Sequence, residues 1–291
     1  IKVYIYANGQ LQHIGATKFW DEHGKNLALT KRNGEMVVQT YHKFRDIPKY
    51  EFALGCLYGK PWHERMYSLA VQAESFGADG ILYDQLGIFA PFACYGKGHG
   101  HATPHYAYAE ERPGFVRSIA DEIQKKNPDF AILTEGLHDS ILDSIGLFHG
   151  CQYGTFLWDS GKDIPARSTG KVAGSFPELW RYTFPELAST LRYPTPMIHR
   201  TLVNYAAAFG FRHDLEVRYA PDRKYVLEGK VPTKADYGTV VSPPDLKWMQ
   251  SHDPKSVAAY LKAVCGLQLK YGKYLLAGRF VDTDGFSIAD G

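Results

Sequence analysis

Two carboxylates follow short apolar segments in two successive helix–strand units of the sequence. Asp84 ends the segment Gly80–Asp84, and Glu135 ends the segment Asp129–Glu135. Each segment predicts a buried strand of a parallel sheet, and neighbouring strands lie about 4.8 Å apart. Carboxyl groups roughly 5–5.5 Å apart are what a retaining glycosidase needs. One group attacks the anomeric carbon, and the other protonates the leaving oxygen and then activates the water that releases the sugar.

The helices before these strands have one apolar face each. Apolar residues recur at spacings of three and four between Met66 and Phe76 and again between Phe115 and Ile123, which is typical of amphipathic helices. Alternating helices and strands predict an α/β fold with a parallel sheet, and a carboxylate at a strand's carboxyl end lies where TIM barrels carry their chemistry. We therefore expect a (β/α)8 TIM barrel that lacks its first strands, with inserted loops and a small β insertion.

Other elements are predicted from composition and turn residues. We expect residues 1–291 to form one catalytic barrel domain that is part of a longer chain. The predicted strands are Ile1–Tyr6, Glu35–Gln39, Glu51–Cys56, Glu178–Phe184 and Tyr274–Val281. The further predicted helices are Leu137–Phe148, Asn204–Phe209 and Val257–Cys265. We expect Phe211–Glu216 to be a strand end or a loop and Val217–Asp245 to be irregular.

Composition narrows the classes of partner. The formal net charge is only +2 and aromatic residues make up 14% of the chain, which argues against nucleic acid and suits the aromatic surfaces that bind sugars. No apolar run is long enough for a membrane span. The four cysteines contain no C-x-x-C pair and could form disulfides or remain free.

Two motifs resemble the α-glycosidase barrels. Asp79–Asp84 is similar to the nucleophile strand of the α-amylase group, the endo-α-N-acetylgalactosaminidases and the α-galactosidases, and Leu133–Gly136 is similar to the acid/base strand of the first two. His213-Asp214 resembles the pair with which the amylase group stabilises its transition state. The resemblance implies that Asp84 is the nucleophile, Glu135 the acid/base and Asp214 a stabiliser, acting on an α-linked glycan.

The region from Tyr4 to Phe211 also resembles an uncharacterised bacterial family of glycoside hydrolases. The residues that carry this likeness are Gly80–Gln85, Gly98–His101 and Thr134–Gly136. Two features separate the chain from an amylase proper: the 51-residue spacing between the carboxylates (135 − 84) and Leu82 in place of an arginine. The resemblance therefore does not indicate which sugar the enzyme would cleave. A polysaccharide-degrading enzyme of this kind would act outside the cell or in the periplasm.

Further residues are expected to contact the carbohydrate. Gly87–Pro113 reads as one long loop, which favours a functional role, and its histidines are suited to bind sugar hydroxyls. The predicted substrate-binding residues are Tyr6, Asn8, Tyr83, Gln85, Tyr95, His99, His101 and Trp158.

Two alternatives remain open at this point. His99 and His101 form an H-x-H pair, which binds zinc in the amidohydrolase barrels, so a metal-dependent barrel hydrolase is one alternative. The other is a barrel that binds carbohydrate without cleaving it. In the favoured interpretation we expect no resident metal or cofactor, and the sequence indicates no oligomeric state.

Overall fold

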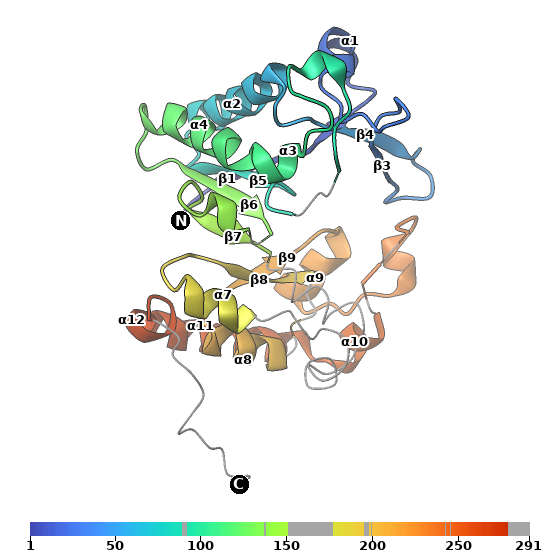
Figure 1. Cartoon of the computed structure of the whole chain (residues 1–291). Helices are drawn as coiled ribbons and strands as arrows, with labels where there is room; N and C mark the ends of the chain where they lie inside the picture. The colour runs from blue at the N-terminus through green and yellow to red at the C-terminus, as the bar shows by residue number, and fades with distance from the viewer. Residues whose placement is uncertain are drawn as a thin grey trace. The chain divides into compact units, whose positions relative to one another are not determined.

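The computed structural model describes residues 1–88, 92–136, 138–150, 177–194, 198, 200–241, 243–244 and 246–278. They divide into two compact units (Figure 1). The first unit comprises Ile1–His149 and Tyr237–Pro243, and the second comprises Gly150–Asp236 and Pro244–Gly291. Each unit is described by itself below. The prediction of a single domain over the whole chain stays a prediction.

The first unit is built on a four-stranded sheet in which every neighbouring pair is parallel. Its order is β1-β5-β6-β7. The strands are β1 (Tyr4–Asn8), β5 (Gly80–Asp84), β6 (Ala131–Glu135) and β7 (Leu147–His149). Since the strands are parallel, their carboxyl ends all lie along one edge of the sheet.

Two helices cover one face of this sheet, as Figure 1 shows. They are α2 (Lys60–Ser75) and α4 (Arg112–Gln124), and each has a proline in its first turn, where the missing N–H costs nothing. The buried residues of α2 are Trp62, Met66, Ala70 and Ala73. The buried Tyr83 side chain reaches this layer, and its hydroxyl donates to the Met66 carbonyl oxygen at 2.6 Å. Because side chains alternate along a strand, Leu82 and Asp84 point to the opposite face.

A small antiparallel sheet interrupts the barrel-like pattern after β1. Its order is β2-β4-β3, with strands β2 (Leu11–His13), β3 (Val38–Tyr41) and β4 (Tyr50–Leu54). Between β2 and β3 the chain forms the helix α1 (Thr17–His23) and the short 3-10 turn η1 (Gly24–Asn26). A small β structure was expected in this region and is observed; that it is an insertion into a barrel stays a prediction.

The segment from β5 to β6 contains the 3-10 turn η2 (Lys97–His99) and the short helix α3 (Ala107–Glu110) before α4. After β6 comes η3 (Asp139–Ile141) and then β7. The prediction of a helix over Leu137–Phe148 is wrong, because its last residues pair with β6 in the sheet instead.

The second unit contains a pair of parallel strands and six helices among its described residues. The strands are β8 (Thr190–Pro194) and β9 (Arg212–Glu216). The helices are α7 (Pro177–Thr183), α8 (Arg200–Ala208), α9 (Ala220–Glu228), α10 (Leu246–Ser251), α11 (Pro254–Lys270) and α12 (Gly272–Leu275). A 3-10 turn, η4 (Lys234–Tyr237), follows α9. The predicted helices Asn204–Phe209 and Val257–Cys265 are confirmed, and Phe211–Glu216 proves to contain a strand. The prediction that Val217–Asp245 is irregular is wrong, because Ala220–Glu228 forms α9.

Tertiary contacts explain two wrong predictions in this unit. Glu178–Phe184 has the aromatic composition of a strand but folds as α7, where the buried Arg181 guanidinium donates to the carbonyl oxygens of Phe209, Leu187 and Leu276. Such contacts override local β propensity. The predicted strand Tyr274–Val281 begins in α12, and residues 279–281 lie outside the described part of the chain.

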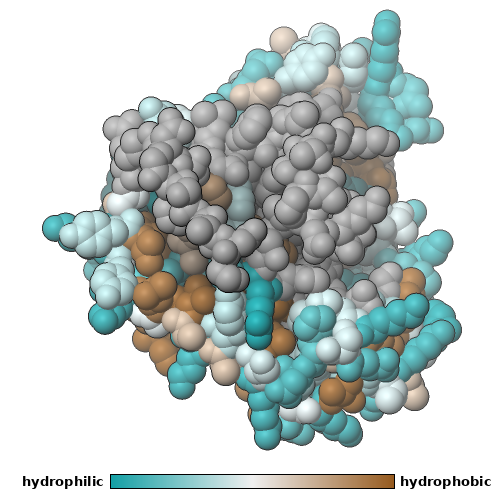
Figure 2. Space-filling view, turned by 90° about the horizontal axis from the view of Figure 1, so that it is seen from below, coloured by the Kyte–Doolittle hydropathy of each residue, from teal (hydrophilic) through white to brown (hydrophobic). Residues whose placement is uncertain are grey.

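Apolar residues also reach the surface. On the face shown in Figure 2 they stand in small groups between hydrophilic residues. In the second unit, Leu269 and Tyr274 are among the exposed ones. Apolar side chains in small groups of this kind are common on protein surfaces and by themselves indicate no interface.

The α/β class with parallel strands is confirmed. Within the described ranges the parallel strands form a sheet of four and a pair, so a closed eight-stranded barrel is not seen there. No helix among these residues is both long and apolar enough to cross a bilayer.

Two glycines in the first unit should respond to alanine in opposite directions. A Cβ on Gly80 would collide with the Ala131 carbonyl group of β6, whereas one on Gly114, in α4, would meet no described atom within 4 Å apart from its chain neighbours and the nearby backbone of its own helix. We expect Gly80→Ala to destabilise the protein by about 1–3 kcal/mol and Gly114→Ala to stabilise it by up to about 1 kcal/mol. Urea unfolding midpoints test both, and equal shifts for the two variants would contradict the packing described here.

Candidate active site

Backbone register brings Asp84 and Glu135 to the same place on the sheet. The β5–β6 partners run from Gly80 opposite Ala131 to Tyr83 opposite Thr134. Asp84 and Glu135 are the next residues on the two strands, and both stand at the carboxyl ends. Residues at equivalent positions of neighbouring parallel strands point to the same face, about 4.8 Å apart at the backbone. The two carboxylates therefore project from one edge of the sheet on one face.

Strand β1 orients the Asp84 carboxylate. Asn8 lies directly opposite Asp84 in the register, and its side-chain amide donates to Asp84 Oδ2 at 3.2 Å. The Tyr6 hydroxyl donates to the same oxygen at 2.6 Å. Hydrogen bonds to a charged acceptor are stronger than neutral ones. Three residues predicted from the sequence to belong to the site are thus brought together.

The surroundings of Tyr6 raise the pKa of its hydroxyl. The Tyr6 ring is exposed, but its hydroxyl loses solvent beside Asp84. This desolvation comes first among the causes that raise the pKa of Tyr6, followed by the hydrogen bond and the charge of Asp84, and the charge of Glu135 acts in the same direction. The phenol therefore stays protonated at neutral pH and keeps its role as a donor to Asp84.

Glu135 is held in a tightly packed edge of the sheet and is only 7% exposed. The turn after β5 crosses close to it, because a Cβ on Gly87 would lie 2.6 Å from the Glu135 carbonyl oxygen. The Gly87 N–H donates to the Thr134 hydroxyl at 2.7 Å, and that hydroxyl donates to the Tyr83 carbonyl oxygen at 3.1 Å. Only glycine allows this close approach. The hydrogen bonds that Gly87 and Thr134 make there connect the end of β5 to the end of β6.

Gln85, the residue after Asp84, has a left-handed backbone with φ of +64°. A side chain other than glycine rarely takes this conformation, and it tends to occur at functional sites. The side-chain amide of Gln85 donates to the Tyr41 hydroxyl of β3 at 2.8 Å. The backbone carbonyl oxygen of Gln85 accepts from the side-chain amide of Gln10 at 2.5 Å. These bonds connect the end of β5 to the antiparallel insertion and place Gln85 next to the carboxylate pair.

The structure does not show three other predicted residues in this cluster. Tyr83 faces the helix layer through its bond to Met66 and does not share a face with Asp84. Asp214 belongs to the second unit, where it lies on β9 and accepts from the Thr190 hydroxyl at 3.3 Å. Trp158 lies outside the described residues. The carboxylate pair with Tyr6, Asn8 and Gln85 is therefore a cluster of the first unit alone.

The loop residues form a second cluster that the sequence analysis did not foresee. His99 and His101 lie with Cys56 and Cys94, and one ligating atom from each residue lies within 4.8 Å of the other three. Tyr95 follows Cys94 and is half-buried, with its N–H donating to the Thr30 carbonyl oxygen at 2.8 Å. The local spacing Cys94-x4-His99-x-His101 was a usable signal, but Cys56 is far away in the sequence.

The two cysteines of this cluster influence each other. A hydrogen bond from the Cys56 thiol, opposed by burial and aided by His99, lowers the pKa of Cys94. The same pairing, with burial, raises the pKa of Cys56.

The first part of the chain matches a known family. The family described as "Domain of unknown function (DUF6259)" matches residues 1–164, which is more than half of the 291 residues. The chain belongs to the DUF6259 family. The matched region of this DUF6259 chain includes β1, β5 and β6 and all four residues of the Cys–His cluster. No curated protein matches the sequence.

Solved structures extend the comparison to the fold. An α-N-acetylgalactosaminidase from Bifidobacterium bifidum, in complex with GalNAc, is 14% identical with a TM-score of 0.50; the match covers 88% of this chain and 35% of that one. The trehalose-6-phosphate hydrolase of Bacillus licheniformis is 11% identical with a TM-score of 0.54, covering 94% and 68%. The DUF6259 chain thus spans about a third of the length of the first relative. At this identity the likeness concerns the fold, which is shared with glycoside hydrolases.

The hydroxyl of Tyr6 should matter for any chemistry at Asp84. We expect Tyr6→Phe to lower kcat/KM by about ten- to a hundredfold, because a hydrogen bond to a charged group is lost. Tyr4→Phe is the matched control, since Tyr4 lies opposite Gly80 at the other end of the same strand pair. Steady-state kinetics on any cleaved glycoside measures both, and an equal loss in the two variants would contradict a role for the Tyr6–Asp84 bond.

Proposed function

We propose that this DUF6259 protein is a retaining glycoside hydrolase that cleaves an α-linked glycosidic bond. The observation that supports this most is the register of β5 and β6, which carries Asp84 and Glu135 to one edge and one face of a parallel sheet. We expect carboxyl groups at the ends of adjacent strands to lie roughly 5 Å apart, which suits a double displacement, whereas an inverting enzyme needs a wider gap that admits a water molecule.

In this proposal Asp84 is the nucleophile. A nucleophilic carboxylate must be ionised and correctly aimed, and the donors Tyr6 and Asn8 both bond its Oδ2 atom. This arrangement limits rotation of the carboxylate before the attack. Attack on the anomeric carbon forms the glycosyl ester and breaks the bond to the leaving oxygen.

Glu135 is then the acid/base. It gives its proton to the leaving oxygen in the first step and takes a proton from the attacking water in the second, which restores both carboxyl groups. The closely packed turn at Gly87 supports this role, since it holds the backbone of Glu135 against the end of β5.

The substrate is proposed to be a glycan with an α-linkage. Support comes from the order of the two acids in the sequence, an aspartate followed one strand later by a glutamate, and from the exposed aromatic ring of Tyr6 beside them. A ring of this kind can pack against the apolar face of a sugar. Gln85 is proposed to bind sugar hydroxyls, and Asp214 remains a proposed transition-state stabiliser.

Substitution of either acid tests the proposal. Asp84→Asn and Glu135→Gln should each abolish hydrolysis of a glycan while leaving the far-UV circular dichroism and the unfolding midpoint close to those of the parent. Asp79→Asn is the control, because Asp79 lies just before β5 at its amino end, paired with Lys2 near the surface. A screen of aryl glycosides identifies the substrate. Hydrolysis that survives both active-site changes would disprove the assignment, as would sugar binding by the parent without any cleavage.

The two variants should differ on activated substrates. A dinitrophenolate leaves without a proton, so Glu135→Gln should retain the first step on dinitrophenyl α-glycosides and lose about 10²–10⁴-fold on alkyl glycosides, which need an acid. Asp84→Asn should be inactive on both, because no nucleophile is present. Pre-steady-state release of dinitrophenolate measures the difference. The roles would have to be exchanged if Asp84→Asn, and not Glu135→Gln, gave the burst.

A further inference from the structure

The Cys–His cluster in the first unit has the geometry of a closed metal site. Cys56 Sγ lies 3.5 Å from His101 Nε2, and Cys94 Sγ lies 3.2 Å from His99 Nδ1. A tetrahedral zinc ion with bonds of about 2.3 Å to sulphur and 2.0–2.1 Å to nitrogen separates such atoms by about 3.5 Å. The spacing therefore fits a single ion at the centre of the four ligating atoms, which all lie within 4.8 Å of one another.

We propose that Cys56, Cys94, His99 and His101 bind a structural zinc ion. Two thiolates and two imidazoles are the donor set of structural zinc sites, and soft sulphur ligands select against magnesium and calcium. Four protein ligands leave no open coordination position for water or substrate, so the site is not catalytic. This proposal replaces our expectation of a metal-free protein and disfavours a metal-dependent hydrolase using His99 and His101.

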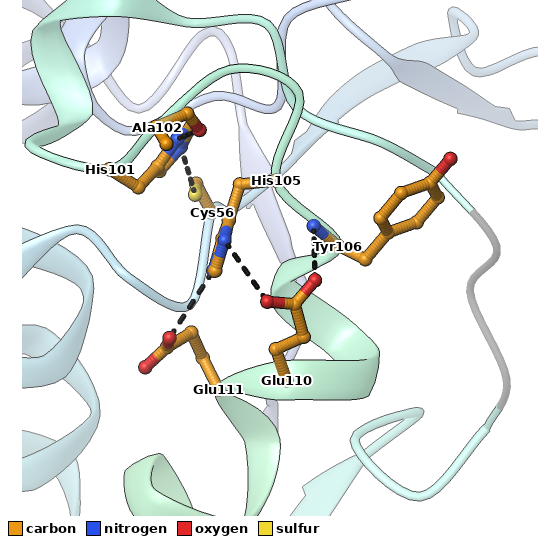
Figure 3. Close-up of polar contacts among 7 residues, drawn as sticks. All are labelled: Cys56, His101, Ala102, His105, Tyr106, Glu110 and Glu111. Carbon is orange, nitrogen blue, oxygen red and sulfur yellow. Dashed lines mark hydrogen bonds and ion pairs between the residues drawn. The ribbon is translucent and has the colours of Figure 1, made fainter.

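Neighbouring groups orient the ligands. His101 Nδ1 lies 2.7 Å from the Ala102 carbonyl oxygen, and an N–H donated there leaves Nε2 to face Cys56, as metal-binding histidines commonly do. The His105 ring stacks on His101 with centroids 4.7 Å apart. Figure 3 shows His105 between the two carboxylates of Glu110 and Glu111, at 3.6 Å and 3.3 Å. His101 is thus packed between the proposed ion and an anchored ring.

The backbone around the cluster also holds its side chains in place. Cys56, Cys94 and His99 are buried. A Cβ on Gly96 would lie 2.5 Å from the His99 ring, so the ring folds back over a position that carries no side chain. Cys94 and His105 exchange two backbone hydrogen bonds at 2.8 Å and 3.0 Å. A preformed pocket of this kind lowers the entropy lost when the ion binds.

The ion would hold together two distant parts of the first unit. Cys56 lies between β4 and α2, and the other three ligands lie in the segment that leads from Asp84 to α3. The four ligands come together only in the folded protein, so the free energy of binding the ion adds to the free energy of unfolding. Zinc would therefore stabilise the loop next to the carboxylate pair without taking part in its chemistry.

Metal analysis of the whole chain tests this inference. Protein purified without chelators should contain about one zinc ion per chain by elemental analysis, and Cys94→Ser and His101→Asn should each remove most of it. Cys265→Ser is the matched control, because Cys265 is a free cysteine in α11 of the second unit. It should keep the full zinc content. Equal zinc in Cys94→Ser and the parent would overturn the proposal.

Cobalt and thiol measurements keep the test decisive if a variant does not fold. Cobalt added to the chelator-treated parent should give the strong visible absorption of a tetrahedral thiolate site, and zinc should displace it and raise the unfolding temperature. Thiol titration of the unfolded parent distinguishes the alternative in which Cys56 and Cys94 form a disulfide. A metal-free protein with both thiols oxidised, or a reduced protein that binds neither metal, would refute the zinc site. These readouts do not depend on hydrolysis, so they stand or fall separately from the proposed function.

Discussion

The pairing register of β5 and β6 is the constraint on which the carboxylate cluster depends. Parallel strands alternate their side chains between two faces, so a slip of one residue would move Glu135 to the helix side while Asp84 stayed in place. Four registered pairs, from Gly80–Ala131 to Tyr83–Thr134, fix the offset. The apolar residues that α2 and α4 bury on the other face penalise any slip. The core packing thereby specifies the distance between two acids that are 51 positions apart in the sequence.

Backbone groups and neutral side chains hold the carboxylate pair in position. Tyr6 and Asn8 of β1 position Asp84, and Gly87 allows the β5 turn to lie against the backbone of Glu135. The strained backbone of Gln85 begins the loop. That loop then carries Cys94, His99 and His101 back to Cys56. The proposed active site and the proposed zinc site are thus consecutive features of one βα connection.

Much of the first unit could be predicted from the sequence. The strands ending in Asp84 and Glu135 follow helices with clear three- and four-residue spacing and carry apolar runs, so local pattern and tertiary fold agree there. Tyr6 and Asn8 could also be anticipated because the amino-terminal segment is rich in β-branched and aromatic residues.

Other features depend on contacts that no local pattern reveals. The face to which Tyr83 points depends on where α2 packs. The aromatic residues of Glu178–Phe184 suggested a strand, but this segment folds as α7, in which Arg181 donates to carbonyl oxygens of distant residues. The grouping of Cys56 with His101 joins residues 45 positions apart in the sequence. The strand β8 was missed because its short segment has no alternation of apolar and polar residues long enough to identify it.

The most direct test of the central claim is to trap the glycosyl ester. In Glu135→Gln the base that activates water is missing, so a dinitrophenyl α-glycoside that the parent cleaves should leave its sugar bound to the protein. Mass spectrometry of the digested protein would locate it. The account predicts one added glycosyl group on the peptide that contains Asp84. A sugar attached to a different carboxylate, or no attached sugar despite a burst of dinitrophenolate, would contradict it.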